Sequence, residues 1–355
     1  MKVGVVDLFC GVGGLSYGLK MADFNVLAGY DIDSSCKYAY ETNVKANFIN
    51  KNIKETTAHE IKECFDKSKS SIKILVGCAP CQTFSQYTQQ SRQKLNNKYD
   101  EKWTLLNEFL RIAMEVQPQI ISVENVPNLQ KYPIFDNFIK ELENNKYKVK
   151  FSVVFCPDYG IPQNRKRLVL LASKLGKIDI IDKTTYHSKN ASVRNAIGNL
   201  PKIKAGEQCK SDKLHIARSL TPINVKRIKA TPKNGGSWKD WDKSLILNCH
   251  KKDKGKTYSS VYGRMKWDEP SPTMTTFCTG IGNGRFGHPE QDRAISLREA
   301  SLLQTFPMDY DFIEDKNAPV KIGIISRHIG NAVPPKLGEV IGRSIKKHLE
   351  SYNEI

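Results

Sequence analysis

The first 180 residues alternate short β-type runs with helical patterns, and this alternation limits the fold more than any other feature. A buried-strand run at residues 3–6 is followed by Leu15, Leu19 and Ala22 at helical spacing. Alternating strands and helices favour a parallel sheet, because each helix carries the chain back to begin the next strand. Further strand candidates lie at residues 25–30, 72–76, 120–123, 148–155 and 168–172. The sequence therefore predicts an α/β fold with a doubly wound sheet.

A glycine-rich segment, DLFCGVGG at residues 7–14, connects the first predicted strand to the first predicted helix. Glycines there let the backbone turn sharply and approach a ligand at the carboxyl edge of the sheet. Asp31 follows Gly11 by 20 residues, at the end of the next strand, where a carboxylate can accept both hydroxyls of a ribose. A dinucleotide-binding site would have glycine where this chain has Ser16. We expect a nucleoside ligand without a pyrophosphate; the alternative is a turn with no ligand.

The segment GCAPCQTFS at residues 77–85 follows another predicted strand and contains two cysteines in a CxxC spacing. A zinc site needs about four ligands, and no second pair is spaced to supply them. A redox pair would normally open a helix in a much smaller domain. A buried, inert thiol is the remaining alternative. Because Pro80 stiffens the loop that places Cys81 at the mouth of the sheet, we favour a reactive thiol at Cys81.

Two further polar segments follow neighbouring strands. Glu124 directly follows the predicted strand at residues 120–123. Adjacent strand ends of a doubly wound sheet converge on one crevice. Cys81 and Glu124 are therefore expected to face one substrate, although a glutamate there could instead cap a helix or pair with a lysine. Arg165 and Arg167 alternate in a loop between the last two strands and offer two guanidinium groups to a phosphate or a carbonyl. The alternative for such a loop is plain solvation.

Positive charge is concentrated in the middle of the chain. Lys and Arg total 55 against 37 Asp and Glu, a net of +18 over 355 residues, and residues 183–266 alone carry +15. This surplus favours nucleic acid or an anionic surface as partner, with a solvated lysine-rich surface as the alternative. Five aromatic residues are interleaved with the charge and strengthen the nucleic-acid interpretation: Trp238, Trp241, Tyr258, Tyr262 and Trp267.

The remaining composition indicates a cytoplasmic protein. Nine cysteines, an odd number in a long chain, are typical of reduced thiols in a cytosol and not of a disulfide framework. No run of about 18 apolar residues occurs, which excludes a transmembrane helix.

Together with further motifs, these segments resemble the S-adenosylmethionine-dependent C5-cytosine DNA methyltransferases. The motifs occur in the family's order and cover nearly the whole chain, apart mainly from residues 185–285. They are the segment at residues 7–14, PCQ at 80–82, ENV at 124–126, QNRKR at 163–167, HPEQDR at 288–293, REA at 298–300, LQTFP at 303–307 and GNAVPP at 330–335.

The resemblance implies a Rossmann-like methyltransferase sheet with an inserted, smaller target-recognition domain. Residues 1–184, completed by 322–355, would form the catalytic domain, and residues 185–321 the target-recognition domain. The implied partner is double-stranded DNA, with a cognate restriction endonuclease as a functional partner in a bacterial or phage modification context. We expect a monomer that uses no metal and no membrane.

The resemblance also implies roles for four residues. The thiolate of Cys81 would add to C6 of a flipped-out cytosine, so that C5 can attack the methyl sulfonium of the co-substrate. Glu124 would hydrogen-bond N3 and the exocyclic amine. Arg167, and less directly Arg165, would hold the base carbonyl and support the active loop. The group that removes the C5 proton is not identified by the sequence.

S-adenosylmethionine would be held by residues spread along the chain: Phe9, Gly11, Val12, Gly14, Asp31, Ile32, Asn52, Ile53, Pro80, Leu105 and Asn331. By the resemblance, Asp31 binds the ribose and Ile32 packs on the adenine. Two positions depart from the family pattern. Asn52 stands where many members have an aspartate, and it would contact the adenine amine through its side-chain carbonyl. Ile32 replaces an aromatic residue that is often found there.

Three alternatives remain open at this point. A tRNA cytosine methyltransferase of the same family usually carries a Cys-Phe-Thr signature, whereas this chain has TFCT at residues 276–279. A catalytically silent DNA-binding protein would not need both Cys81 and Glu124. A thiol oxidoreductase would need Cys78 as well as Cys81, so full activity of a Cys78→Ser variant would exclude it.

Overall fold

The computed structural model describes residues 2–80, 104–185 and 191–353, which divide into two compact units. The first unit contains Met1–Tyr159, Lys166–Tyr186 and Val333–Ile355, and the second contains Gly160–Arg165 and His187–Ala332. The second unit therefore includes residues 322–332, which the sequence analysis assigned to the catalytic domain. Which unit catalyses and which recognises DNA stays a prediction.

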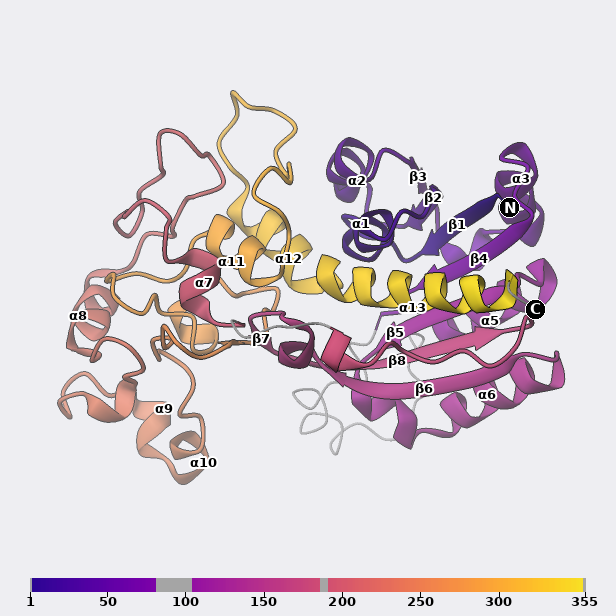
Figure 1. Cartoon of the computed structure of the whole chain (residues 1–355). Coiled ribbons are helices and arrows are strands. Elements are labelled where there is room, and N and C mark those ends of the chain that lie inside the picture. The colour runs from indigo at the N-terminus through magenta and orange to yellow at the C-terminus, as the bar shows by residue number, and fades with distance from the viewer. Residues whose placement is uncertain (1, 81–103, 186–190, 354–355) are drawn as a thin grey trace. The chain divides into compact units, whose positions relative to one another are not determined.

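A seven-stranded sheet forms the centre of the first unit, in the order β3-β2-β1-β4-β5-β8-β6 (Figure 1). Its strands are β1 (Val3–Leu8), β2 (Val26–Asp31), β3 (Asn47–Asn50), β4 (Ile72–Gly77), β5 (Ile120–Asn125), β6 (Lys148–Phe155) and β8 (Lys166–Ser173). The predicted doubly wound α/β fold is confirmed.

One strand departs from the predicted parallel direction. The pairs β1·β2, β1·β4, β2·β3 and β4·β5 are parallel, whereas β8 is antiparallel to both β5 and β6. The reason is the connection between β6 and β8. It contains no α-helix to return the chain across the sheet, and a parallel pair needs such a crossover.

Helices pack on the sheet of the first unit. They are α1 (Gly14–Met21), α2 (Lys37–Val44), α3 (Ala58–Lys67), α5 (Thr104–Val116), α6 (Pro133–Asn144) and α13 (Pro335–Asn353). Val6 and Leu8 of β1 belong to one buried cluster with apolar side chains of α3, α5 and α6. The C-terminal α13 packs against α1 at Gly18, where an added Cβ would lie 2.1 Å from the carbonyl oxygen of Pro335. This close approach ties the end of the chain to its beginning.

The second unit has shorter elements joined by long connections. They are β7 (Gln163–Asn164), α7 (Val193–Ile197), α8 (Pro222–Ala230), α9 (Asn248–Lys251), α10 (Asp253–Lys256), β9 (Ser271–Pro272), α11 (Leu297–Leu303) and α12 (Ile322–Asn331). Within the described ranges of both units, no helix is long and apolar enough to span a membrane.

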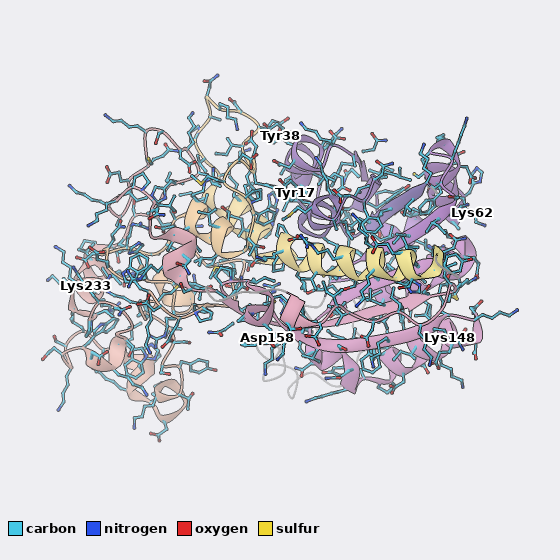
Figure 2. All side chains as sticks on the ribbon, in the orientation of Figure 1. Tyr17, Tyr38, Lys62, Lys148, Asp158 and Lys233 are labelled. Atoms are coloured by element: carbon cyan, nitrogen blue, oxygen red, sulfur yellow. The ribbon has the colours of Figure 1, made fainter. Side chains whose placement is uncertain are left out.

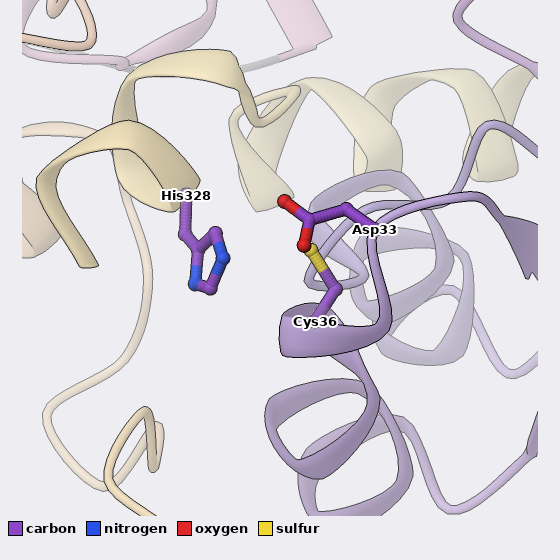
Figure 3. Close-up of side chains that lie close together, drawn as sticks. All are labelled: Asp33, Cys36 and His328. Carbon is purple, nitrogen blue, oxygen red and sulfur yellow. The ribbon is translucent and has the colours of Figure 1, made fainter. Parts of the chain in front are cut away.

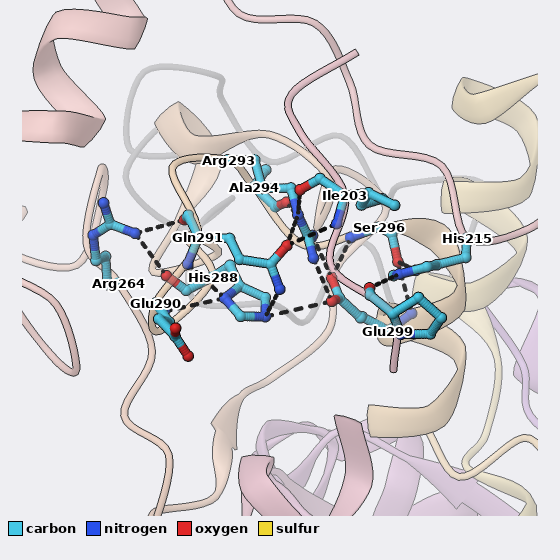
Figure 4. A network of polar contacts seen from close by, with 11 residues as sticks. Ile203, His215, Arg264, His288, Glu290, Gln291, Arg293, Ala294, Ser296 and Glu299 are labelled. Atoms are coloured by element: carbon cyan, nitrogen blue, oxygen red, sulfur yellow. Dashed lines mark hydrogen bonds and ion pairs between the residues drawn. The ribbon is translucent and has the colours of Figure 1, made fainter. Parts of the chain in front are cut away.

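A buried polar network replaces regular structure in the second unit (Figure 4). Arg293 donates two hydrogen bonds to Glu299, at 2.6 and 2.7 Å, and both residues are fully buried. The Glu299 carboxylate also accepts from the backbone N–H of Ser296, which caps α11. Arg264 is buried as well, and its guanidinium donates to backbone carbonyls of Thr231, Ile228 and His288. These charged groups therefore hold loops together and are not available to a ligand.

Candidate active site

The glycine-rich segment forms a tight turn between β1 and α1. Phe9, Gly11 and Gly13 all have positive φ, at 66°, 51° and 90°, and Gly13 caps α1 in the left-handed conformation. A Cβ on Gly11 would meet no atom within 4 Å, so open space lies beside this part of the backbone. Val12 and Gly14 are buried behind it. The turn has the shape expected of a backbone that contacts a ligand.

Asp31 ends β2 beside this turn and is tied to it. Its Oδ2 accepts the backbone N–H of Gly11 at 2.8 Å, and its Oδ1 accepts that of Asp33 at 2.9 Å. Burial raises the pKa of Asp31 above its usual value, although these N–H donors favour the ionised form. Each carboxylate oxygen has two acceptor sites, so a diol can still bind. The next residue, Ile32, leaves 69% of its surface exposed, as a residue that covers a flat ligand would.

Asn52 and Ile53 take structural positions near the end of β3. The Asn52 Oδ1 accepts the backbone N–H of Lys54 at 3.1 Å and caps a short 3-10 helix, Ile53–Glu55. The Ile53 side chain is buried in the core cluster. Leu105, on α5, is half-buried against the same cluster, as is Phe9 in the turn. To make the predicted contact with the adenine amine, the Asn52 Oδ1 would therefore have to accept a second hydrogen bond besides that from the Lys54 N–H.

A second acid, Asp7, lies beneath the turn, and no role for its side chain was predicted from the sequence. It lies one residue before the end of β1 with its side chain buried, and the Ser16 hydroxyl donates to its Oδ2 at 2.6 Å. Burial raises the pKa of Asp7 to about 7. The Ser16 hydroxyl also lies 3.1 Å from that of Tyr40. Ser16, noted only as a departure from the dinucleotide pattern, therefore connects the start of α1 to β1.

The segment after Asp31 is also ordered by local contacts, and Figure 3 shows two of its side chains, Asp33 and Cys36. Asp33 caps a short 3-10 helix, Ser34–Cys36, by accepting the Ser35 backbone N–H at 3.1 Å. Cys36, at the end of this helix, is buried in the first unit. Figure 3 also labels His328, which belongs to α12 of the second unit. The cap fixes the backbone directly after the predicted ribose ligand.

The strongest candidate for chemistry in the described residues lies where β4 and β5 end. Glu124 is 1% exposed, and its Oε1 lies 2.8 Å from the Nε of Arg167 on β8. The Cys78 thiol donates to the other oxygen, Oε2, at 2.7 Å. Oε1 has no aligned hydrogen bond within the described residues. A buried carboxylate oxygen in this state is suited to accept a hydrogen bond from a substrate.

The next residue along β5 strengthens the same connection. Asn125 donates through Nδ2 to the backbone carbonyl of Ala79 at 3.1 Å, and its Oδ1 accepts the backbone N–H of Val126. Ala79 and Pro80 lead directly into Cys81, which lies outside the described residues together with the rest of residues 81–103. The structure thus describes the predicted partners of Cys81 in the first unit, and Cys81 itself stays a prediction.

The two arginines of the QNRKR segment have separate surroundings. Arg167 belongs to the first unit and pairs with Glu124. Arg165 belongs to the second unit and is 4% exposed; it donates to the Gln163 side chain at 3.2 Å and to the Met274 carbonyl at 3.3 Å. The predicted lining residue Asn331 is also in the second unit, at the end of α12. Arg165 is thus held by protein groups, which fits a supporting role.

Known proteins resemble this chain in sequence over nearly its whole length. The model of the family described as C-5 cytosine-specific DNA methylase matches residues 3–347. The chain is 52% identical over 357 residues to the Type II methylase M.HgiDII of Herpetosiphon aurantiacus. That alignment covers 100% of this chain and 98% of the relative. It is 30% identical over 356 residues to the Type II methyltransferase M.PspPI of Psychrobacter sp. (strain TA137), with coverage of 98% and 80%.

A solved structure supports the fold. A prophage-encoded DNA modification methyltransferase from E. coli aligns with a TM-score of 0.74 over 98% of this chain and 100% of that chain, at 24% identity. Because the family model matches nearly the whole chain and a full-length relative shares half of its residues, the chain belongs to the C-5 cytosine-specific DNA methylase family.

Proposed function

We propose that this DNA (cytosine-5)-methyltransferase methylates a flipped-out cytosine through a covalent bond between Cys81 and C6 of the base. The observation that carries the proposal is the buried Glu124 carboxylate, whose Oε1 faces Arg167 and lacks an aligned hydrogen bond in the described residues. The adjoining loop leads to Cys81. The target atom is inaccessible in a stacked duplex, so the base must leave the helix first.

In the proposed mechanism, Glu124 binds the exocyclic amine and N3 of the cytosine. Addition of the Cys81 thiolate to C6 breaks the C5–C6 double bond and makes C5 the nucleophilic carbon of an enamine. Glu124 supports protonation at N3 as that charge develops, and Arg167 holds the base carbonyl. After methyl transfer, loss of the C5 proton restores the double bond and expels the thiolate. A supporting role for Arg165 is also proposed, as the family resemblance implies.

The family uses S-adenosylmethionine as co-substrate, which supplies the methyl group as a sulfonium. The described residues fit a nucleoside. The space beside Gly11 admits a ligand against the backbone, Asp31 offers carboxylate oxygens to a ribose, and the exposed Ile32 offers an apolar face to a base. We propose that Phe9, Val12, Gly14, Asn52, Ile53, Pro80, Leu105 and Asn331 complete this site.

Asp31→Ala is expected to weaken S-adenosylmethionine binding by about 1–3 kcal/mol, the range for hydrogen bonds to a charged group. Asp31 also accepts the Gly11 and Asp33 backbone N–H groups, so Asp31→Asn serves as the matched variant because its carbonyl retains one acceptor. Isothermal titration calorimetry measures both. Equal affinity of the wild type and Asp31→Ala would remove Asp31 from the site.

We further propose that the second unit binds the DNA backbone. Lys233 lies exposed on this unit (Figure 2). Other lysines of the basic segment are also exposed and form no ion pair with a described acidic residue: Lys226, Lys229, Lys239, Lys251 and Lys252. In contrast, Trp238 and Trp241 are each 6% exposed and belong to the interior. The charge therefore supports DNA binding, whereas these two aromatics do not.

Replacing these exposed lysines by glutamine is expected to flatten the dependence of DNA affinity on salt. For every phosphate that a variant no longer neutralises, the slope of log affinity against log salt should become shallower by about 0.9. Fluorescence anisotropy across a salt series measures the slope for pairs such as Lys226→Gln with Lys229→Gln. Lys62→Gln, at an exposed position on α3 of the first unit, is the control (Figure 2). Slopes that match the wild type in every pair would mean that the charge is solvated surface.

Bisulfite sequencing of DNA from cells that express this chain tests the proposed function. The expected result is cytosine-5 methylation within one sequence context, absent from cells that express Cys81→Ser. The family and the full-length Type II relative favour this activity over a tRNA methyltransferase or a silent DNA-binding protein. We also propose a cytoplasmic monomer that needs no metal, with a restriction endonuclease as its functional counterpart. DNA without added 5-methylcytosine would contradict the main proposal.

A further inference from the structure

Cys78 lies opposite Glu124 because of the strand register. β4 and β5 pair with Gly77 opposite Val123, so Cys78, the first residue after β4, lies next to Glu124 of β5. The Cys78 thiol donates to the Glu124 Oε2 at 2.7 Å. One position further, the Asn125 side chain donates to the carbonyl of Ala79. Two consecutive side-chain contacts thus join the end of β5 to the segment that precedes Pro80-Cys81.

The two oxygens of the Glu124 carboxylate have different partners. The thiol occupies Oε2, while Oε1 lies 2.8 Å from the Arg167 Nε and has no aligned hydrogen bond in the described part of the chain. A glutamate side chain has three rotatable bonds, and a donor at one oxygen fixes the direction of the other. Because Glu124 is 1% exposed, water has little access to replace that donor.

We propose that Cys78 is a positioning residue, whose thiol holds the Glu124 carboxylate so that Oε1 is presented to the cytosine. This inference rests on the proposed function, since it assigns a supporting group to the same reaction. In this role Cys78 acts through Glu124 and not on the base itself. Its removal should slow the chemical step and leave the binding of both substrates unchanged, because the glycine turn and the basic surface are not altered.

The test compares side chains with and without a donor at position 78. In steady-state assays on the full chain, Cys78→Ala and Cys78→Val are expected to lower kcat about fivefold to twentyfold, the effect of about one hydrogen bond, with unchanged KM for DNA and S-adenosylmethionine. Cys78→Ser, which restores an O–H donor, should recover most of kcat. Cys64→Ala is the control, since Cys64 is a half-buried thiol on α3.

The outcomes separate this inference from the proposed function. Wild-type kcat in both Cys78→Ala and Cys78→Val would overturn the positioning role, as would a Cys78→Ser variant as slow as Cys78→Ala. A parallel rise in KM would also overturn it, because a general disturbance of the loop would then explain the slower turnover. If the wild type itself forms no covalent complex with 5-fluorocytosine DNA, the proposed function fails, and this inference fails with it.

Discussion

DNA that carries 5-fluorocytosine at the target position is expected to trap the enzyme in a covalent complex that survives denaturing electrophoresis. If the Cys81 thiolate adds to C6, methyl transfer leaves both a methyl group and fluorine on C5. Fluorine cannot leave as a proton does, so elimination stalls and the sulfur–carbon bond persists. The complex should form only when S-adenosylmethionine is present. Its yield should approach the amount of active enzyme, which makes this the largest effect that we predict.

Cys81→Ser is expected to lose both the complex and turnover, because a serine hydroxyl is far less ionised than a thiol near neutral pH. DNA binding measured by anisotropy should remain, since the basic surface is unchanged. Cys278→Ser is a suitable control, because burial raises the pKa of the Cys278 thiol to about 11 and that residue lies in the second unit. Peptide mapping that located the modified residue at Cys78 or another cysteine would refute the assignment of Cys81.

The central strands β1, β4, β5 and β8 could be predicted because they are mostly buried on both faces and contain apolar runs. The predicted strands at 25–30, 72–76 and 120–123 correspond to β2, β4 and β5. β3 was not among the strand candidates, because Asn47–Asn50 has only four residues and a polar residue at each end. The antiparallel direction of β8 agrees with the loop that the sequence predicts between the strand candidates at 148–155 and 168–172, because a connection without a helix joins antiparallel strands.

The candidate site was predictable where it depends on motifs, and less so where it depends on register. Glu124 and Arg167 come from separate motifs, and the structure brings their side chains within 2.8 Å. The contact between Cys78 and Glu124 arises from the pairing of β4 with β5, which no spacing in the sequence reveals. The role of Ser16 likewise depends on its placement next to Asp7.

Which residues of the second unit are buried was the hardest feature to predict. Its interior contains charged and aromatic residues of the basic segment, which the sequence suggested would lie on a surface for nucleic acid. Trp238 donates to the Tyr258 carbonyl, and Trp241 donates to the Thr231 hydroxyl. Both rings are therefore buried with their N–H groups satisfied, although the basic segment suggested a surface for nucleic acid. Arg264, counted among the surplus positive charges, is buried by backbone acceptors.

His288 occupies a position in the buried network that excludes its protonated form (Figure 4). Its Nδ1 accepts the backbone N–H groups of Glu290 and Gln291, at 3.1 and 2.9 Å. A proton on Nδ1 would face both donors, which disfavours the protonated ring; the other nitrogen, Nε2, lies 3.2 Å from the Gln291 Nε2 and 3.5 Å from the Glu299 Oε1. Burial lowers the pKa of His288 to about 4, from an ordinary value of 6.5.

The contribution of His288 to the free energy of unfolding is therefore expected to fall as the pH drops from 6.5 toward 4. In this window the unfolded chain binds a proton at His288 and the folded chain does not, so acid favours unfolding. A difference of about 2.5 pKa units corresponds to about 3 kcal/mol at the lower end. The depressed pKa of Glu299 adds a loss of stability only at lower pH, as the pH falls through the folded-state pKa of that carboxylate. The raised pKa of Asp7 acts in the opposite sense.

Comparing His288→Asn with the wild type isolates the histidine, since the effect of Asp7 cancels in the difference and Glu299, with its lowered pKa, titrates at lower pH. The asparagine Oδ1 can accept the backbone N–H groups that Nδ1 accepts, but it does not titrate. Urea unfolding at pH 7.5, 6.5, 5.5 and 5.0 should show that the free energy of unfolding of the wild type falls relative to that of His288→Asn as the pH drops. His59→Asn, at an exposed position on α3, should retain the wild-type dependence on pH. Parallel curves for the wild type and His288→Asn would show that His288 is protonated in the folded protein as readily as in the unfolded chain.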